Sequence, residues 1–305
     1  MTNLLELYIK LVGLVLVGIF LGRILPTTFP TRLGKLLFWV GVPISIFAFL
    51  RQTDLSGQIW IAPAIAHIAI LLGAFLAWLG IRGQVYWRNS SLHNSTQGSL
   101  MLAAMVGNTG YLGYPITLTM VGKEYFAWAL FYDLLGTLIG VYGLGVLLAS
   151  RFGGKAGNYL QTAKAIIFNP PLWSFGFGLI LRPMPIPSVV ELTLETLAWC
   201  ALAASLILMG MRVSQLDSWY KLKPAGISIV IKMLFVPLLL GNCLPLFGVT
   251  GEAAQVIVLQ MSMPPAFGTL ILAETFDLDR DLAVTTLGMG LMVLLFTLPM
   301  WLWLF

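Results

Sequence analysis

Ten long apolar runs follow one another along this 305-residue chain and leave little sequence between them. Each run holds roughly 18–25 residues, the length at which an α-helix crosses about 30 Å of hydrocarbon. No connection is long and polar enough to form a separate soluble domain. We predict ten transmembrane spans, at 4–25, 33–50, 60–80, 99–121, 125–148, 165–182, 192–211, 225–247, 253–276 and 282–305.

The composition supports an all-α integral membrane protein whose main surroundings are the lipid bilayer. Only 10% of the residues are charged, whereas soluble proteins carry about 25%. A β-barrel is disfavoured, because barrel strands alternate apolar and polar residues and these runs do not. The net charge of +5 does not indicate nucleic-acid binding, since the basic residues lie at the ends of the runs. The two cysteines, Cys200 and Cys243, fit no metal-ligand spacing.

Lysine and arginine in the connections predict the orientation, because cytoplasmic loops are enriched in them. The connections after odd-numbered spans carry twelve of these residues, and those after even-numbered spans carry three. The twelve are Arg23, Arg32, Lys35, Arg82, Arg88, Arg151, Lys155, Lys164, Arg212, Lys221, Lys223 and Arg280. We therefore expect both termini on the non-cytoplasmic side of the plasma (inner) membrane.

Ten spans divide into two sets of five whose orientations are opposite, so any internal repeat has to be inverted. The first five-helix repeat would occupy 1–150 and the second 165–305, with a short cytoplasmic loop at 151–164. A weak internal likeness joins the ends of spans 1 and 6, at 18–26 and 176–183. Inverted repeats of this kind are common in secondary transporters.

Spans 4 and 9 each contain a cluster of helix-disrupting residues, at 107–115 and 261–268. Proline removes a backbone donor, and glycine tolerates non-helical geometry. The clusters begin at similar depths, roughly 13 Å and ~17 Å into their spans. Broken helices expose peptide groups that lipid cannot satisfy, and the start of a half-helix favours an anion. The plainer alternative is that both spans are only kinked, but two clusters at matching positions indicate a transporter binding site.

At these positions the sequence resembles the auxin efflux carrier (PIN-like) family, in the superfamily of bile acid, arsenite and riboflavin transporters. The likeness rests on 108–115, on 263–268 with 272–276, and on Asn169-Pro170-Pro171, and it extends over nearly the whole chain. The chain departs from the plant PIN proteins in its short loop at 151–164, in Pro265 and in Pro171. These departures put auxin itself in doubt as the substrate.

The resemblance implies a fold of two inverted five-helix repeats with broken crossover helices at spans 4 and 9. Spans 1, 2, 6 and 7 would form a scaffold that also joins two copies in a homodimer. Spans 3–5 and 8–10 would form a transport unit that carries the substrate in an elevator-like movement. The substrates of the family are small organic anions, namely carboxylates such as auxin, malate or malonate.

The substrate would then bind where the two breaks cross. The candidate substrate-binding residues are Asn108, Thr109, Gly110, Tyr111, Pro115, Met263, Pro264, Pro265 and Ala266. Asn108 matches a substrate-contacting position of the family, and its amide can donate to a carboxylate. Its alternative role is to cap the broken half-helix, and both roles can coexist.

Four further residues are candidates for ion coupling or charge pairing. A lysine at the depth of Lys232 is costly and needs a partner or a task, so we expect it to pair with Asp133 or Glu274 or to attract the anion. A partly buried Asp133 could carry protons. His67 titrates near neutral pH when unperturbed, although a packing role is the simpler reading. We expect coupling to H⁺ or Na⁺ and no other cofactor.

Other functions fit the sequence less well. A sodium-coupled symporter of the bile-acid type shares the inverted-repeat plan, but Ser262, Thr109, Thr269 and Glu274 would supply only some of the oxygen ligands that sodium needs. A channel remains an alternative that electrical recording would identify. An intramembrane enzyme needs a nucleophile or metal constellation, and we find no such pattern. We expect a transporter and no enzyme.

Overall fold

The computed structural model describes residues 2–88, 92–154, 159–215 and 221–305, and these residues form helices and no strand. The α-helices are α1 (Thr2–Ile24), α2 (Phe29–Leu36), α3 (Val42–Leu50), α4 (Ile61–Arg88), α5 (Asn94–Met105), α6 (Tyr114–Met120), α7 (Phe126–Phe131), α8 (Leu138–Gly140), α9 (Val146–Gly153), α10 (Tyr159–Ile167), α11 (Pro170–Leu181), α12 (Ser188–Ser214), α13 (Leu222–Val230), α14 (Val236–Cys243), α15 (Gly251–Ser262), α16 (Phe267–Thr275) and α17 (Arg280–Leu304). Wider π-helical turns join several of them, at η1 (Leu37–Gly41), η2 (Thr109–Gly113), η3 (Tyr132–Thr137), η4 (Val141–Gly145) and η5 (Ile231–Phe235), and η6 (Leu244–Phe247) is a 3₁₀ turn.

Six apolar helical stretches in the described residues are long enough to cross a membrane. They are Phe29–Leu50, Ile61–Gly83, Phe126–Gly153, Ser188–Ser214, Leu222–Phe247 and Arg280–Leu304. Two shorter apolar helices accompany them, at Leu11–Ile24 and Pro170–Leu181. This agrees with the predicted integral membrane protein built from helices.

The outer surface of these helices carries large apolar side chains. Trp303 is 85% exposed, Phe296 79% and Ile180 67%, although all three lie within apolar helices. Many other large apolar side chains are exposed on the same helices and their neighbours, which is unusual for the surface of a soluble monomer. Hydrocarbon, and not water, is the solvent that this surface suits.

The region between the two predicted repeats differs from the expectation. The predicted loop at 151–164 is not wholly a loop, because α10 begins at Tyr159; residues 155–158, with the predicted cytoplasmic Lys155, lie outside the described residues. The predicted sixth span begins at Pro170 instead of 165. Two prolines at the first helical positions explain the later start, since proline lacks the donor that would continue α10 into α11.

Glycines hold α1 and α12 in backbone contact. A Cβ added at Gly18 would lie 2.1 Å from the carbonyl oxygen of Ile207, and one at Gly210 would lie 2.0 Å from that of Val15. No real side chain fits at such distances, so only glycine permits this approach. Close packing of small residues is a general way of holding membrane helices together.

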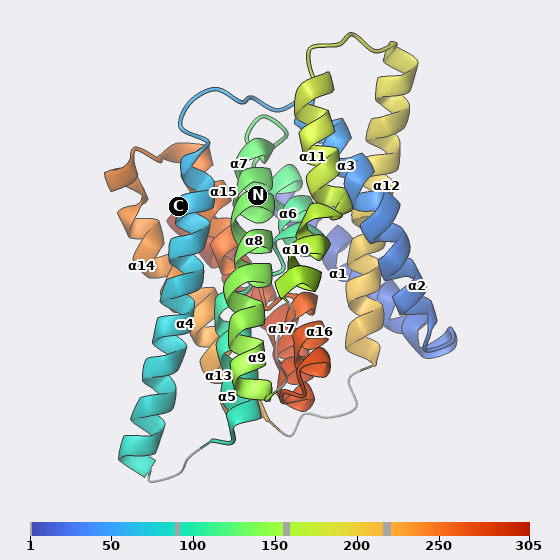
Figure 1. Cartoon of the computed structure of the whole chain (residues 1–305). Coiled ribbons are helices and arrows are strands. Elements are labelled where there is room, and N and C mark those ends of the chain that lie inside the picture. The colour runs from blue at the N-terminus through green and yellow to red at the C-terminus, as the bar shows by residue number, and fades with distance from the viewer. Residues whose placement is uncertain (1, 89–91, 155–158, 216–220) are drawn as a thin grey trace.

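The helices fall into two groups by their contacts, and Figure 1 shows the members of the first, α2, α3, α11 and α12, on one side of the molecule. On the right of the figure, α12 packs against α1 and α3, and α3 packs against α11. The second group includes α4 packed on α5, α13 packed on α17, and α14 packed on α15. The short η2 lies against α12, and α6 lies against α1 and α12, which brings the π-helical turn to the boundary between the groups.

Candidate functional site

Both predicted breaks are present. The first follows Met105, where α5 ends and Val106 is extended (φ −110°, ψ 118°). The second follows Ser262, where α15 ends, and Ala266 is extended (φ −75°, ψ 148°) before α16 begins. Glycine and proline therefore do interrupt the helices here, as their local chemistry predicts.

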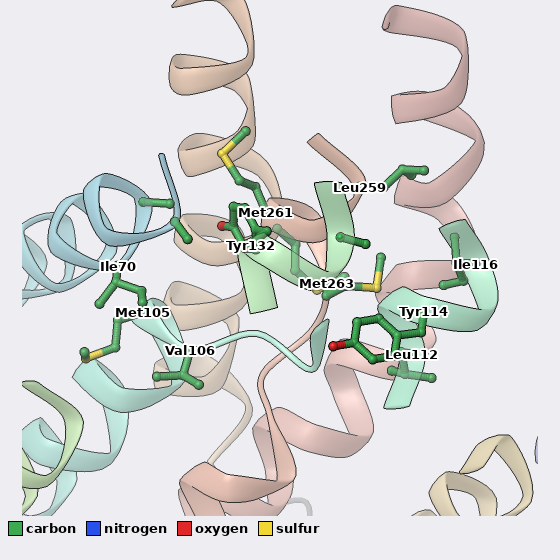
Figure 2. Packing of buried hydrophobic residues seen from close by; sticks show 14 of the residues in the cluster. Ile70, Met105, Val106, Leu112, Tyr114, Ile116, Tyr132, Leu259, Met261 and Met263 are labelled. Carbon is green, nitrogen blue, oxygen red and sulfur yellow. The ribbon is translucent and has the colours of Figure 1, made fainter. Parts of the chain in front are cut away.

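The two breaks pair with each other through their backbones. Gly107 and Pro265 form an isolated antiparallel bridge. The Asn108 N–H donates to the carbonyl of Pro264 at 2.8 Å, and the Ala266 N–H donates to the carbonyl of Val106 at 3.0 Å. Figure 2 shows the surroundings of this crossing, with Val106 on one segment and Met263 on the other. Each break thus satisfies peptide groups of the other that lipid would leave unpaired.

Lys232 is buried beside the crossing and binds the end of the helix that precedes the second break. Its side chain is 3% exposed, and its Nζ donates to the carbonyl of Met261 at 2.7 Å. Met261 lies in the last turn of α15, where carbonyls lack helical partners and cations are favoured. The expected pairing with Asp133 or Glu274 is not found; the structure gives Lys232 a peptide carbonyl instead.

Gly107 is the residue of the first break that lies against this lysine. A Cβ added at Gly107 would lie 2.9 Å from Lys232 Cε and 3.1 Å from the carbonyl oxygen of Met263. The absence of a side chain at Gly107 therefore lets the ammonium group of Lys232 and the backbones of both breaks pack against one another.

Asp133, in η3, holds the turn that follows the first break. Its two carboxylate oxygens accept hydrogen bonds from the hydroxyl of Thr109 and from that of Tyr114, the latter at 2.7 Å. Because Thr109 begins η2 and Tyr114 follows directly after it, the carboxylate is bonded on both sides of the turn.

A cavity of about 630 Å³ opens beside the crossing. Its polar wall comes from both breaks and their supports, and includes Asn108, Thr109, Gly110, Tyr111, Asp133 and Ala266. Its apolar wall includes Phe38, Val42, Leu138 and Ile271. Binding sites for small molecules have this size and this mixture of apolar walls with a few polar groups.

A second, smaller cavity of about 110 Å³ adjoins the same residues. Pro264 and Pro265 line it, and Asn108 lines both cavities. Two predicted site residues, Pro115 and Met263, are buried and line neither cavity. Pro115 is the second residue of α6, so these two residues shape the breaks without facing the open space.

The side chain of Asn108 is 5% exposed and makes no capping hydrogen bond to η2. Its Nδ2 donates to the sulfur of Met209 at 3.2 Å. Thioether sulfur is a weak acceptor, so the amide keeps the capacity to donate to a better one. The capping role considered from the sequence is not seen.

Two other predicted residues lie apart from the crossing. His67 Nδ1 lies 2.7 Å from the carbonyl oxygen of Pro63, one turn earlier in α4; since a carbonyl only accepts, this nitrogen carries the proton. His67 lines neither cavity. Glu274 lies on the wall of both, but its Oε1 accepts from Nε of Arg280 at 2.9 Å. Of the four candidates for ion coupling, Asp133 alone lies at the crossing with a carboxylate facing the larger cavity.

One face of α12, which the sequence did not single out, reaches both breaks. The hydroxyl of Ser205 lies 2.9 Å from the carbonyl oxygen of Tyr111 and 2.7 Å from that of Leu202 in the same helix, and its single proton can go to either. Met209 contacts Asn108, and the guanidinium of Arg212 lies 4.3 Å from the ring centre of Phe267. The three residues are spaced as one helical face requires, but that spacing alone could not show what the face contacts.

The two ends of the site differ. Beyond the first break, Lys123 pairs with Glu195 of α12, and Gln52 also donates to Glu195 at 3.1 Å. The hydroxyl of Thr53 donates to the carbonyl of Glu124 at 2.8 Å beside them. These contacts join the connection between α6 and α7 to α12 and to the segment after α3. The residues that line the larger cavity include Lys35 and Arg212, from α2 and from the opposite end of α12.

Comparisons with known proteins identify the family of this chain. The model of a family described as membrane transport protein matches residues 4–302. An uncharacterized transporter of Methanothermobacter thermautotrophicus is 30% identical over 274 residues, which cover 89% of this chain and 87% of the relative. An uncharacterized transporter of Methanocaldococcus jannaschii is 27% identical over 300 residues, or 95% of each chain. The chain therefore belongs to the membrane transport protein family, the family of the auxin efflux carriers, and its relatives are named as transporters and not as enzymes.

Proposed function

We propose that this protein is a secondary active or facilitative transporter of a small organic anion, a carboxylate, which binds beside the crossing of α5–α6 and α15–α16. The observation that carries the proposal is the pairing of the two breaks next to a cavity of about 630 Å³. A helix that only bends around a proline has no reason to place its break against a second one and beside an open space.

The preference for an anion follows from the groups that the breaks present. Phe267 begins α16 at the cavity wall, and the first N–H groups of a helix carry partial positive charge. Asn108 adds an amide whose present acceptor is a sulfur atom. A carboxylate is a stronger acceptor than that sulfur and would take its place.

An elevator-type movement of the site is the mechanism that we propose. The contacts of Lys123, Glu195 and Thr53 close one end of the site, whereas the larger cavity lies toward the other. Alternating access requires that the closed end open and that the end with the cavity close. In the predicted orientation the cavity lies on the cytoplasmic side, and both termini lie on the non-cytoplasmic side.

The proposed architecture has two inverted repeats of five helices. Within the described residues, the six long apolar stretches, the two shorter apolar helices and the two broken pairs make ten candidate segments. In this arrangement α1, α3, α11 and α12 belong to the scaffold, and α4–α9 and α13–α17 to the transport unit. Residues 1–150 and 165–305 are the proposed repeats, and a homodimer through the scaffold rests on the family likeness.

Asp133 is our candidate for proton coupling. It lines the cavity and bonds to Thr109 and Tyr114 around the first break, so gaining or losing a proton there would alter the turn beside the substrate. We expect Asp133→Asn to remove the dependence of uptake on an imposed pH gradient. The alternative, a sodium-coupled symporter of the bile-acid type, would show uptake that depends on sodium in both proteins.

The test is a thermal-shift screen of the purified protein followed by uptake into proteoliposomes. Malonate, malate, benzoate and indole-3-acetate are assayed with and without sodium between pH 5.5 and 8. A ligand that binds only the folded protein raises its Tm. We expect at least one carboxylate to do so and to be transported, and an increase with sodium would favour the alternative. Absence of any shift and of any uptake with all four would overturn the proposed substrate class, and currents far above carrier turnover would indicate a channel.

A further inference from the structure

A single arginine outside the predicted site stands on the wall of both cavities. Arg212 lies in the last turn of α12 and lines both the larger and the smaller cavity, as Asn108 does. In the sequence it is one of the twelve basic residues that predict the orientation.

The guanidinium of Arg212 is held in place without using up its donors. It lies over the ring of Phe267 at 4.3 Å, which is a cation–π arrangement. Its Nη2 reaches the hydroxyl of Thr31 only at 3.4 Å, and its Nε has no hydrogen-bond partner in the described part of the chain. Since a guanidinium carries five N–H donors, most of its capacity remains for a ligand.

The carboxylates nearby are committed elsewhere. Glu274, on the same cavity wall, accepts from Arg280, and Asp133 accepts from Thr109 and Tyr114. The ion pairs formed among the described residues do not include Arg212. Glu274 is near enough to act on the charge of Arg212, but no ion pair joins the two. The cavity thus contains a guanidinium that is stacked and oriented and has no direct carboxylate partner among the described residues.

We propose that Arg212 binds the carboxylate of the transported anion, together with Asn108, in the conformation seen here. This inference rests on the proposed function. The planar guanidinium matches a carboxylate with two parallel hydrogen bonds, a geometry that lysine lacks. The two residues come from different groups of helices, because Arg212 belongs to α12 and Asn108 to the first break. The anion therefore bridges the two groups at this end of the site, and a movement of the transport unit separates the anion from Arg212.

The experiment measures binding of malonate, benzoate and indole-3-acetate, each beside its neutral amide, by thermal shift on the wild type, Arg212→Gln, Arg212→Lys and Arg151→Gln. Arg151 is an exposed arginine in the last turn of α9 and lines neither cavity. We expect a carboxylate but not its amide to stabilise the wild type and Arg151→Gln equally. We expect the affinity to fall at least tenfold in Arg212→Gln and by a smaller factor in Arg212→Lys.

A second measurement uses only the wild type and so does not depend on whether the variants fold. Phenylglyoxal modifies accessible arginines, and mass spectrometry reports the modified positions. The bound carboxylate should slow modification of Arg212 severalfold and leave that of Arg151 unchanged. Equal affinity in wild type and Arg212→Gln, or no protection of Arg212 when the carboxylate binds, overturns the inference and leaves the proposed function standing. If no carboxylate of the panel binds the wild type, both fail together.

Discussion

The backbone N–H of Asn108 donates to the carbonyl oxygen of Pro264 at 2.8 Å, although 156 positions separate the two residues along the chain. This bond, with its neighbour from Ala266 to Val106, turns two interrupted helices into one structural unit. Because the main chain makes both bonds, the side chain of Asn108 is free for another purpose.

Asn108→Ala should therefore remove binding without removing the fold. The backbone pairing needs no side chain at this position, and the lost contact to the Met209 sulfur is weak. Loss of one hydrogen bond to a charged ligand costs about 1.5–3 kcal/mol, or roughly tenfold or more in affinity. Thermal shift with the best carboxylate measures this change. Asn242→Ala is the control, since Asn242 is an exposed asparagine on α14 and lines neither cavity; an unchanged affinity in Asn108→Ala would remove Asn108 from the site.

Lys232→Met should lower the stability of the fold and leave the affinity for the carboxylate unchanged. The variant leaves the carbonyl of Met261 without its donor at 2.7 Å, and an unpaired buried carbonyl costs about 1–3 kcal/mol. Lys232 lines neither cavity, so protein that remains folded should bind its carboxylate with the wild-type affinity. The comparison is Lys223→Met, an exposed lysine on the neighbouring helix α13, whose Tm should not change. A large loss of affinity at unchanged Tm would instead give Lys232 the direct role in binding.

Gly290→Ala, in α17, should destabilise the protein by crowding the prolines of the second break. A Cβ at this position would lie 2.8 Å from Cβ of Pro264 and 2.9 Å from Cδ of Pro265, and a proline ring, being closed onto its own backbone nitrogen, cannot rotate away. Overpacking of this kind typically costs about 1–3 kcal/mol. Gly176→Ala in α11, where a Cβ meets nothing within 4 Å, should be neutral or stabilising, because alanine favours helix. Chemical denaturation in detergent compares the two, and equal stability of both variants would show that the prolines are not packed as described.

Asp279, which caps the start of α17, predicts a stability that depends on pH. Burial disfavours its charged form, but Lys221, the hydroxyl of Thr96 and the N–H of Leu282 outweigh burial and hold the pKa of Asp279 below its ordinary value. A carboxylate with a lowered pKa contributes stability above its unfolded pKa, and this contribution is lost as the pH falls through the folded value. Asp279→Asn should therefore have a Tm lower by a few degrees at pH 7, with the difference shrinking below about pH 4.

The control for that series is Asp281→Asn. Asp281 lies two residues later in the same first helical turn and is exposed. Its Tm should follow the wild type at every pH. A difference between Asp279→Asn and the wild type that stays constant down to pH 3 would contradict the lowered pKa.

The sequence predicted the breaks because their cause is local. Gly107 and Pro264 act on the residues beside them, and hydropathy reports the helices on either side. What the breaks contact is not local. Lys232 was expected to find a carboxylate, but the carbonyl that it bonds lies 29 positions away on another helix, and only folding brings the two together.

The contribution of α12 was missed for the same reason. Ser205, Met209 and Arg212 lie in an ordinary apolar helix whose sequence shows no break, motif or buried charge at unusual depth. Their importance comes from the tertiary arrangement, which lays that face of α12 along both breaks. The later start of the sixth span has a local cause, the prolines at 170 and 171. The sequence did not reveal it, because residues 165–168 continue the apolar run on the other side of these prolines.

The glycine contact between α1 and α12 has a mechanical consequence. With Gly18 against Ile207 and Gly210 against Val15, sliding or rotating either helix would bring a residue with a side chain to a place where a Cβ has no room, so we expect the two helices to move as one unit. The opposite face of α12 meets the breaks through three separate side-chain contacts, those of Ser205, Met209 and Arg212. In the proposed elevator movement these would be the contacts that change, so a substitution that loosens the pairing of α1 with α12 should impair transport before it impairs binding of the substrate.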